Sequence, residues 1–286
     1  MRLGAAVFYN GTDPEEFALA HVAKGYGAAI CPHWVTLDKP TELQAFKKAM
    51  AKHDVKIAEV GAWCNPMHPD KGEAEEKIQY IIGRLRLAEE LEAGTCVNIL
   101  GTKQTDNWFG PCKEGYSQSF FEEAVDVSRR IIDAVNPERT KYSFEMMPYY
   151  FLDGPEAYLR FLDAVDRKAA GIHLDICNTM NHPARFYDNA GFIRHTFDLM
   201  RDRIVSLHLK DIALRRDSLT AVFEEVLPGT GGIDYRVLME EIRKLPEDVA
   251  AIIEHLETEE DYDKATLAVL VSAKEAGMER VGMCWK

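Results

Sequence analysis

The sequence predicts an α/β fold, a single (β/α)8 TIM barrel that spans residues 1–286. Eight short apolar runs rich in β-forming residues alternate with longer amphipathic stretches along the whole chain. This alternation is typical of parallel strands joined by right-handed helical crossovers. A doubly wound open sheet is the alternative, but that fold usually begins with a glycine-rich turn, and here the first strand leads into VFYNGTDPEE. The closed barrel is therefore favoured.

The predicted elements follow one another without a domain linker, low-complexity segment or charged tail. The strands are expected at LGAAVF (3–8), GAAICP (27–32), VKIAEVG (55–61), TCVNIL (95–100), KYSFEM (141–146), GIHLDI (171–176), IVSLHL (204–209) and AAIIEH (250–255). The clearest helices, with apolar residues at helical spacing, are expected at 40–53, 76–93 and 119–135. The segments CNPMHPDKG and LPGTGG are expected to be strand-to-helix loops.

Composition argues against several classes of function. The chain has 286 residues, of which 47% are hydrophobic, so it can bury a large core. Its formal net charge of −13 disfavours nucleic acid and anionic membranes as partners. No apolar run approaches the roughly 18 residues of a membrane span, and the first residues lack a signal-peptide pattern, so a cytoplasmic location is expected. The six cysteines form no CxxC pair, which gives a zinc knuckle or disulfide framework little support.

Four polar residues close predicted strands in the second half of the chain. They are Glu145 (KYSFE), Asp175 (GIHLD), His208 (IVSLH) and Glu254 (AAIIE), and their positions advance by 30, 33 and 46 residues. A strand-plus-helix unit of a barrel takes about 30 residues, and barrel active sites lie at the carboxyl ends of strands. Any one of the four could be a solvated strand end or a helix cap. Four together, each after a buried strand, favour a metal site, because an unpaired buried charge costs several kcal/mol.

The residue types also indicate which metal to expect. Three carboxylates and one imidazole suit one divalent ion, with Mn or Mg first and Co or Zn next. Side chains alternate along a strand, so His173 shares a face with Asp175 and lies one layer deeper. From there it could hydrogen-bond a ligand carboxylate, or it could be an ordinary core histidine.

The chain resembles the sugar phosphate isomerase/epimerase superfamily of xylose isomerase-like TIM barrels. The motifs that carry the likeness are FEMMP at Glu145, HLDICN at Asp175, SLHLKD at His208, LPGTGGIDY before the last unit and IIEHLE at Glu254. The resemblance implies that these four residues bind one divalent metal. It also implies that Glu145 and Glu254 flank the reacting carbon as an acid/base pair.

The chemistry of these residue types leads to a reaction class. A metal that binds a substrate carbonyl and a neighbouring hydroxyl acidifies the adjacent C–H and stabilises an enediolate. One glutamate then removes the proton and the other returns one. Return to the same carbon or to its neighbour makes a sugar isomerase or epimerase, which is the expected function. Loss of a β leaving group makes the alternative, a lyase or dehydratase on keto-sugars or keto-inositols, including the C-glycoside deglycosidase type.

Candidate substrate-binding residues lie near the four strand-end residues. Many ketose epimerases have a histidine three residues after the ligand Asp. This chain has Asn178 there, and His182 is the candidate substitute. Lys210, on the same face as His208, is expected to polarise a substrate oxygen or to pair with a carboxylate. An arginine that meets substrate in the superfamily corresponds to Arg215 or to the adjacent Arg216.

Aromatic residues are expected to form another wall of the site, because sugar rings pack C–H faces on aromatic planes. The candidates are Phe8 at the end of the first strand, Trp63 and Trp108, with ordinary loop packing as the alternative. The segment 101–119 is a candidate lid over the site. The LPGTGG loop is a candidate source of backbone amides for a phosphate.

The partner expected from these features is a small sugar or keto-sugar. The sequence is also compatible with a homo-oligomer. A DNA-repair endonuclease of the same superfamily would need further histidine and acidic ligands and a basic face, which the net charge disfavours. A sugar-binding module without a metal is the alternative that is not an enzyme.

Overall fold

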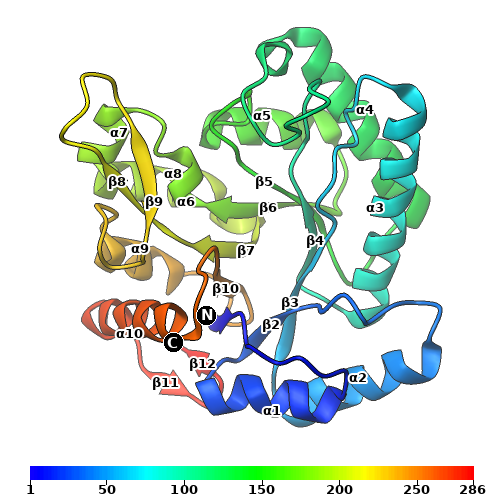
Figure 1. Ribbon diagram of the computed structural model, residues 1–286, viewed down its shortest axis with the longest axis vertical. Helices are drawn as coiled ribbons and strands as arrows, with labels where there is room; N and C mark the ends of the chain where they lie inside the picture. Colours follow the sequence, from blue (N-terminus) through cyan, green and yellow to red (C-terminus); the bar gives the residue numbers. More distant parts are fainter.

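Eight parallel strands close into a barrel surrounded by helices in the computed structural model, which describes residues 1–286 (Figure 1). The strand order around the barrel is β1-β10-β7-β6-β5-β4-β3-β2. Apart from the β1–β10 pair that closes the barrel, strands that are adjacent in space are therefore consecutive barrel strands in sequence. The predicted (β/α)8 barrel is therefore confirmed. No helix has the length and apolar character needed to cross a membrane.

The eight barrel strands coincide with the eight predicted runs. They are β1 (Arg2–Ala5), β2 (Ala28–Ile30), β3 (Lys56–Gly61), β4 (Thr95–Asn98), β5 (Tyr142–Glu145), β6 (Ala170–Asp175), β7 (Ile204–Leu209) and β10 (Ala250–Ile253). Outside the barrel, two antiparallel pairs are β8 (Asp211–Leu214) with β9 (Phe223–Val226), and β11 (Arg280–Val281) with β12 (Cys284–Trp285).

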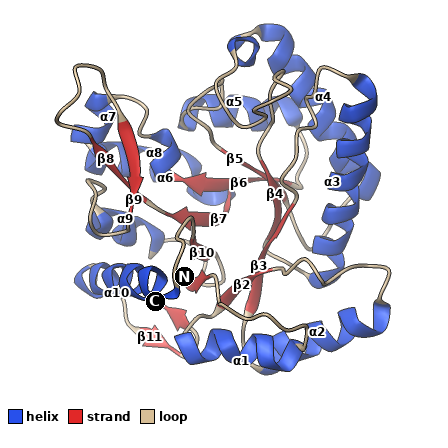
Figure 2. Ribbon diagram, in the orientation of Figure 1, coloured by secondary structure: helices blue, strands red, loops and turns tan.

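The helices form the outer layer (Figure 2). They are α1 (Pro14–Lys24), α2 (Pro40–Lys52), α3 (Lys71–Leu91), α4 (Gln118–Val135), α5 (Pro155–Val165), α6 (Ile176–Thr179), α7 (Pro183–Tyr187), α8 (Asn189–Met200), α9 (Tyr235–Ile242) and α10 (Glu259–Glu275), with the 3-10 helices η1 (Lys113–Tyr116) and η2 (Arg201–Arg203). Side-chain caps begin several of them: Asp13 accepts from the amides of Glu15 and Glu16 before α1, and Asp70 caps α3 in the same way.

Some strand ends differ from those expected. The first strand was expected to reach Phe8, but β1 ends at Ala5, because its pairing with β10 ends at the Ala5–Ile253 register. Phe8 therefore lies in the loop beyond the strand. Glu254 is the first residue after β10 rather than part of it.

The β8–β9 hairpin is an insertion outside the barrel that the sequence does not predict. It lies between β7 and α9, and Figure 1 shows it in yellow beside α7. The polar run LRRDSLT forms its tip. All of β9 is half-exposed or exposed and lacks the apolar run typical of a buried strand, whereas β8 begins with the buried residues Asp211 and Ile212. All six cysteines are free thiols.

Candidate metal centre

The four strand-end residues meet at the carboxyl end of the barrel. One ligand atom each from Glu145, Asp175, His208 and Glu254 lies within 4.8 Å of the others. Neighbouring strands place them side by side, since Asp175 on β6 is in register with His208 on β7. Glu145, Asp175 and His208 are buried, and Glu254 is partly buried. A group of this kind can hold one divalent cation.

The two carboxylate oxygens of Asp175 have different partners. Oδ1 accepts hydrogen bonds from the amides of Cys177 (2.8 Å) and Asn178 (3.4 Å), and so it caps the short helix α6. Oδ2 is left facing the other ligand residues. The helix cap therefore uses one oxygen of Asp175 and leaves the other facing the group, so the cap does not exclude the predicted metal site.

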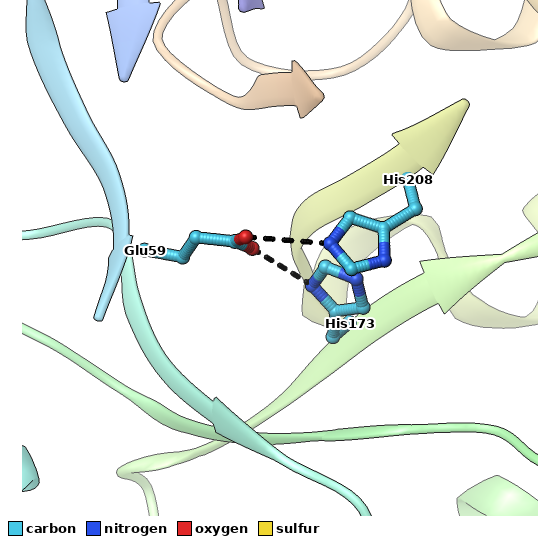
Figure 3. A group of neighbouring side chains, drawn as sticks. All are labelled: Glu59, His173 and His208. Atoms are coloured by element: carbon cyan, nitrogen blue, oxygen red, sulfur yellow. Dashed lines mark hydrogen bonds and ion pairs between the residues drawn. The ribbon is translucent and has the colours of Figure 1, made fainter. Parts of the chain in front are cut away.

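Glu59 on β3 contacts the far side of the histidine pair (Figure 3). His208 donates from Nε2 to Glu59 Oε1 at 3.3 Å, and His173 Nδ1 lies 3.7 Å from Glu59 Oε2. All three side chains are buried. A carboxylate behind an imidazole favours a proton on the nitrogen that faces it, and Nδ1 of His208 faces the other side, 2.7 Å from Glu254 Oε1.

His173 lies one layer below the four residues, as strand parity predicts, but its partners differ from the expectation. Its Nδ1 contacts Ser206 Oγ at 2.6 Å, and its ring lies edge-on to His208 at 3.9 Å between centroids. No hydrogen bond joins His173 to a ligand carboxylate. The register of β6 with β7 places Ser206, rather than a carboxylate, opposite His173.

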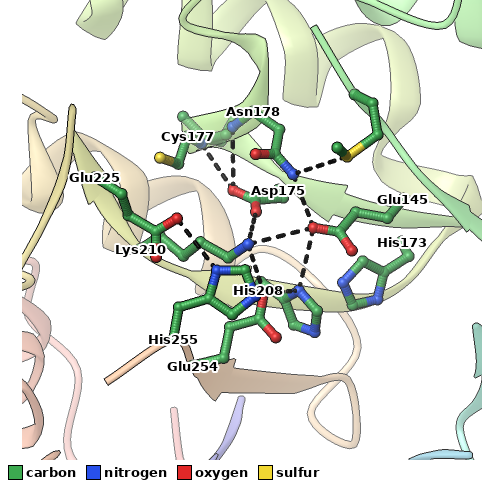
Figure 4. A network of polar contacts seen from close by, with 12 residues as sticks. Glu145, His173, Asp175, Cys177, Asn178, His208, Lys210, Glu225, Glu254 and His255 are labelled. Carbon is green, nitrogen blue, oxygen red and sulfur yellow. Dashed lines mark hydrogen bonds and ion pairs between the residues drawn. The ribbon is translucent and has the colours of Figure 1, made fainter. Parts of the chain in front are cut away.

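Lys210 occupies the centre of the carboxylate group (Figure 4). Its Nζ lies 2.6 Å from Glu254 Oε1, 3.0 Å from Asp175 Oδ2 and 3.4 Å from Glu145 Oε1. Asn178 donates from Nδ2 to the same Glu145 oxygen at 2.8 Å. Lys210 therefore pairs with the carboxylates, and it is also positioned to reach a substrate oxygen in the same space.

Burial and these cations set the protonation of the carboxylates. Burial raises the pKa of Asp175 to about 6 although Lys210 is close by. Burial also acts to raise the pKa of Glu145, but Lys210 and His208 outweigh it and hold that pKa well below its usual range. For Glu254 burial is likewise outweighed, chiefly by His208, which lowers the pKa to about 2. Both glutamates are thus anionic at neutral pH.

The polar atoms left without hydrogen bonds fit a metal ion. Asp175 Oδ2, His208 Nδ1 and Glu254 Oε1 are buried and make no hydrogen bond of regular geometry. Their close neighbours are charged groups: Lys210 Nζ lies 3.0 Å and 2.6 Å from the two oxygens, and His208 Nδ1 lies 2.7 Å from Glu254 Oε1. Buried polar atoms are normally hydrogen-bonded, and each exception requires an explanation. Three such atoms in one ligand group, each from a residue type that binds Mn or Mg, are what an ion-binding site provides.

A cavity of about 340 Å³ opens above these residues. Trp63, Trp108 and Phe109 form its aromatic wall, and Glu145, Asn178, Lys210 and Glu254 line it as well. The ring centroid of Trp63 lies 6.4 Å from that of His208. The segment 101–119 thus borders the site through Trp108 and Phe109, while its role as a lid stays a prediction.

Three candidate substrate residues are not among the cavity lining. Phe8 is about half exposed and packs edge-on against Tyr262. His182 accepts a hydrogen bond from the amide of Ala184 and so caps α7. Arg215 lies on the exposed hairpin, where it pairs with Asp217 and Glu224. Arg216 is also exposed there.

The LPGTGG loop has its amides occupied. Buried Asp211 accepts from the amides of Gly229 (3.0 Å), Gly231 (2.9 Å) and Ile233 (3.1 Å), as well as from Ile212. These hydrogen bonds use the donors that a phosphate would need. The expected phosphate contact is therefore replaced by an internal carboxylate.

Two residues near the site carry weak or no sequence signal. Glu59 lies within VKIAEVG, two residues before the end of the strand, and it is buried. An acidic residue inside an apolar strand is the one feature of the sequence that could have pointed to it. His255 lines the cavity and contacts Glu225 Oε2 of β9 at 3.2 Å. Its backbone is left-handed, with φ of 61°, which the sequence does not reveal.

The chain is similar to known proteins over most of its length. A family model described as xylose isomerase-like TIM barrel matches residues 22–272. A D-psicose 3-epimerase from Clostridium cellulolyticum H10 has a similar structure, with a TM-score of 0.68, 12% identity and coverage of 96% of this chain and 99% of that one. A xylose isomerase-like TIM barrel protein from Mycobacterium smegmatis, solved in complex with magnesium, has a TM-score of 0.65, 15% identity and coverage of 96% and 97%. At these identities the structures show a shared fold.

One curated relative is similar in sequence. It is a 3-oxo-isoapionate decarboxylase from Pectobacterium atrosepticum, 28% identical over 143 residues. The alignment covers 49% of this chain and 50% of the relative, so it spans half of the relative's length.

Proposed function

Because the chain belongs to the xylose isomerase-like TIM barrel family, we propose that it is a divalent-metal-dependent isomerase or epimerase of a small sugar. The observation that carries the proposal is the meeting of two ionised glutamates with Asp175 and His208 beside one cavity. Sugar epimerases among the similar structures support it.

Glu145, Asp175, His208 and Glu254 would hold the ion, with Mn or Mg as the first choice. Once bound, a divalent cation acts as a Lewis acid that acidifies the C–H next to a substrate carbonyl. The magnesium complex of a similar structure supports this choice. Oxygen-rich ligation with a single imidazole supports it on chemical grounds.

Glu145 and Glu254 would move the proton. Both are anionic at neutral pH and therefore able to accept it. Asn178 orients Glu145, and Lys210 would donate to the substrate oxygen on which negative charge develops. Trp63 and Trp108 would pack on the sugar ring and exclude water from the cavity.

A lyase is the second candidate, and the likeness to a decarboxylase favours it. Loss of carbon dioxide from a 3-oxo acid leaves the same kind of enolate as proton removal beside a carbonyl. A site that stabilises one of these anions can stabilise the other, and only the fate of the substrate differs.

The decisive experiment is deuterium exchange. The Mn-loaded protein would be incubated in heavy water with ketoses, keto-inositols and 3-keto-glycosides, and the products analysed for exchanged carbons and lost groups. Exchange without loss of a group supports the isomerase, and release of water, carbon dioxide or an aglycone supports the lyase.

We expect Glu254→Gln to lower the exchange rate at least 100-fold, because the amide cannot accept the proton. Exposed Glu257 on the following loop provides the matched control, Glu257→Gln, which should retain activity. Full exchange activity in the Glu254 variant would refute the acid/base assignment. Protein purified without chelator that neither contains nor binds a divalent ion would refute the metal assignment.

A further inference from the structure

A second depression adjoins the reaction cavity at the carboxyl ends of β2 and β3. We call it the α3 groove, and it has a volume of about 690 Å³. It lies between the β2–α2 loop and helix α3, and the residues that matter here are Leu37, Trp63, Tyr80, Gly83 and Arg84. None of the proposed metal ligands lines it.

Trp63 is common to the groove and the reaction cavity. The close approach of its indole to the barrel depends on Gly61 at the end of β3, where a Cβ would lie 2.5 Å from Trp63 Nε1. Trp63 therefore forms a boundary shared by the two spaces. The two spaces together can accommodate a molecule larger than one sugar ring.

The exposed surface of the groove combines apolar and aromatic side chains with the polar residues His33, Asp38 and Gln79. Leu37 and Trp63 are each 40% exposed, and Tyr80 is 48% exposed. Below them Arg84 donates from Nε to the carbonyl of Gly61 at 2.9 Å and takes part in none of the ion pairs of the molecule. Apolar and aromatic side chains beside a guanidinium and other polar groups suit a ring that carries oxygen atoms.

Gly83 provides an independent indication that this space is kept open. It lies in the interior of α3, where glycine costs about 1 kcal/mol relative to alanine. No atom lies within 4 Å of the position that its Cβ would occupy, and its φ is not in the left-handed region. Neither packing nor backbone conformation requires glycine here, whereas a side chain would project into the groove.

We propose that the α3 groove is a subsite for a second ring of the substrate, joined to the sugar that occupies the reaction cavity. The substrate is then a glycoside of a keto-sugar, whose ring carbonyl lies in the reaction cavity, and its second ring has an apolar face that packs on Trp63 and Tyr80. An aryl aglycone and a second sugar ring share this chemistry. The proposal rests on the proposed function, because it places the reacting sugar in that cavity.

The test is a binding comparison that needs no turnover. Metal-loaded wild-type protein would be titrated with methyl, phenyl and glucosyl β-D-glucosides, none of which carries the ring carbonyl that the proposed reaction needs, with binding followed by saturation-transfer NMR. We expect the preferred two-ring ligand to bind roughly tenfold more tightly than the methyl glycoside, as one stacked ring provides. A phenyl preference identifies an aglycone subsite, and a glucosyl preference identifies a second sugar subsite.

Gly83 supplies the matched variants. Gly83→Leu fills the groove and should reduce the ratio of two-ring to one-ring affinity to about one, while Gly83→Ala should retain most of it. Both raise helix propensity, so both should fold, which circular dichroism would verify.

Equal affinities for all three ligands, or a ratio insensitive to Gly83→Leu, would overturn the subsite. A change of oligomeric state in Gly83→Leu would overturn it too, since a second copy of the chain would then cover the groove. If binding is sensitive to Gly83 but the wild-type protein shows no exchange or elimination, the proposed function fails while the subsite stands.

Discussion

Lys210 neutralises a buried group of carboxylates that would otherwise repel one another. Its Nζ lies within 3.4 Å of Glu145, Asp175 and Glu254, and burial leaves little water to screen them. A divalent ion would supply the same positive charge. The lysine and a bound metal would thus act on one electrostatic balance.

We predict that Lys210→Met destabilises the metal-free protein by about 3–5 kcal/mol, because it leaves buried carboxylates without their cation. Added Mn should restore much of this loss, so the metal-induced rise in melting temperature should exceed that of the wild type. Calorimetry with chelator and with Mn measures both. Lys264→Met, which removes an exposed pair with Glu260, is the control and should have little effect. An equal metal-induced rise in both proteins contradicts the prediction.

Glu59 acts on the site through His208. We predict that Glu59→Gln lowers metal affinity about 10–100-fold, because the imidazole loses the carboxylate that fixes its proton on Nε2. Competition with a chelating dye measures the affinity. The melting temperature of the metal-free variant shows whether the fold is intact. Unchanged affinity would mean that Glu59 only fills the barrel interior.

Helix α1 buries a histidine in its last turn. His21 is 2% exposed, contacts the carbonyl of Phe17 through Nδ1 at 2.9 Å, and packs against the Phe17 and Tyr26 rings. Burial lowers its pKa, although the hydrogen bond to Phe17 acts in the opposite direction. The folded protein therefore keeps His21 neutral at a pH where the unfolded chain is protonated.

The sign of the pH effect follows from this difference. Below the unfolded pKa of about 6.5 the unfolded state binds the extra proton, so stability falls as the pH falls. Between pH 6.5 and 5, the free energy of unfolding of the wild type should therefore depend on pH more steeply than that of His21→Leu. We predict that the substitution reduces this slope by up to about 1.4 kcal/mol per pH unit. Urea unfolding at a series of pH values gives the slope, and the value at pH 8 gives the packing change alone. Parallel curves for the two proteins would exclude His21 as the source.

Closure of the barrel joins the first strand to the last across the whole chain. β1 pairs with β10 from Arg2–Ala250 to Ala5–Ile253 and with β2 at Gly4–Ala28. A Cβ at Gly4 would lie 2.5 Å from both the Ala28 carbonyl oxygen and Ile252 Cδ1. The packing of β1 between β10 and β2 therefore depends on a glycine at this position.

We predict that Gly4→Val destabilises the protein by at least about 1–3 kcal/mol, because the close contact includes backbone that cannot move aside. Gly83→Ala, in open space, should leave stability equal or higher. Since one barrel spans residues 1–286, we also expect a single unfolding transition by fluorescence and by circular dichroism. Separate transitions would contradict the single domain, which stays a prediction.

The sequence by itself determined the barrel, the order of its strands and the strand-end positions of the four candidate ligands. These follow from local periodicity, because a strand buried on both faces is an apolar run and a parallel crossover needs a helix. Glu145, Asp175, His208 and Glu254 were found because a charge stands out at the end of such a run.

Only the tertiary structure decided which side chains from distant segments share a space. Glu59 reaches His208 from across the barrel, Asp211 takes the amides of the glycine-rich loop, and His182 and Arg215 turn to local partners. The α3 groove likewise joins a loop and a helix around one tryptophan. The hydrophobic periodicity of a segment predicts only which face of its strand or helix a side chain lies on. These contacts depend instead on barrel closure and loop geometry, to which widely separated parts of the chain contribute.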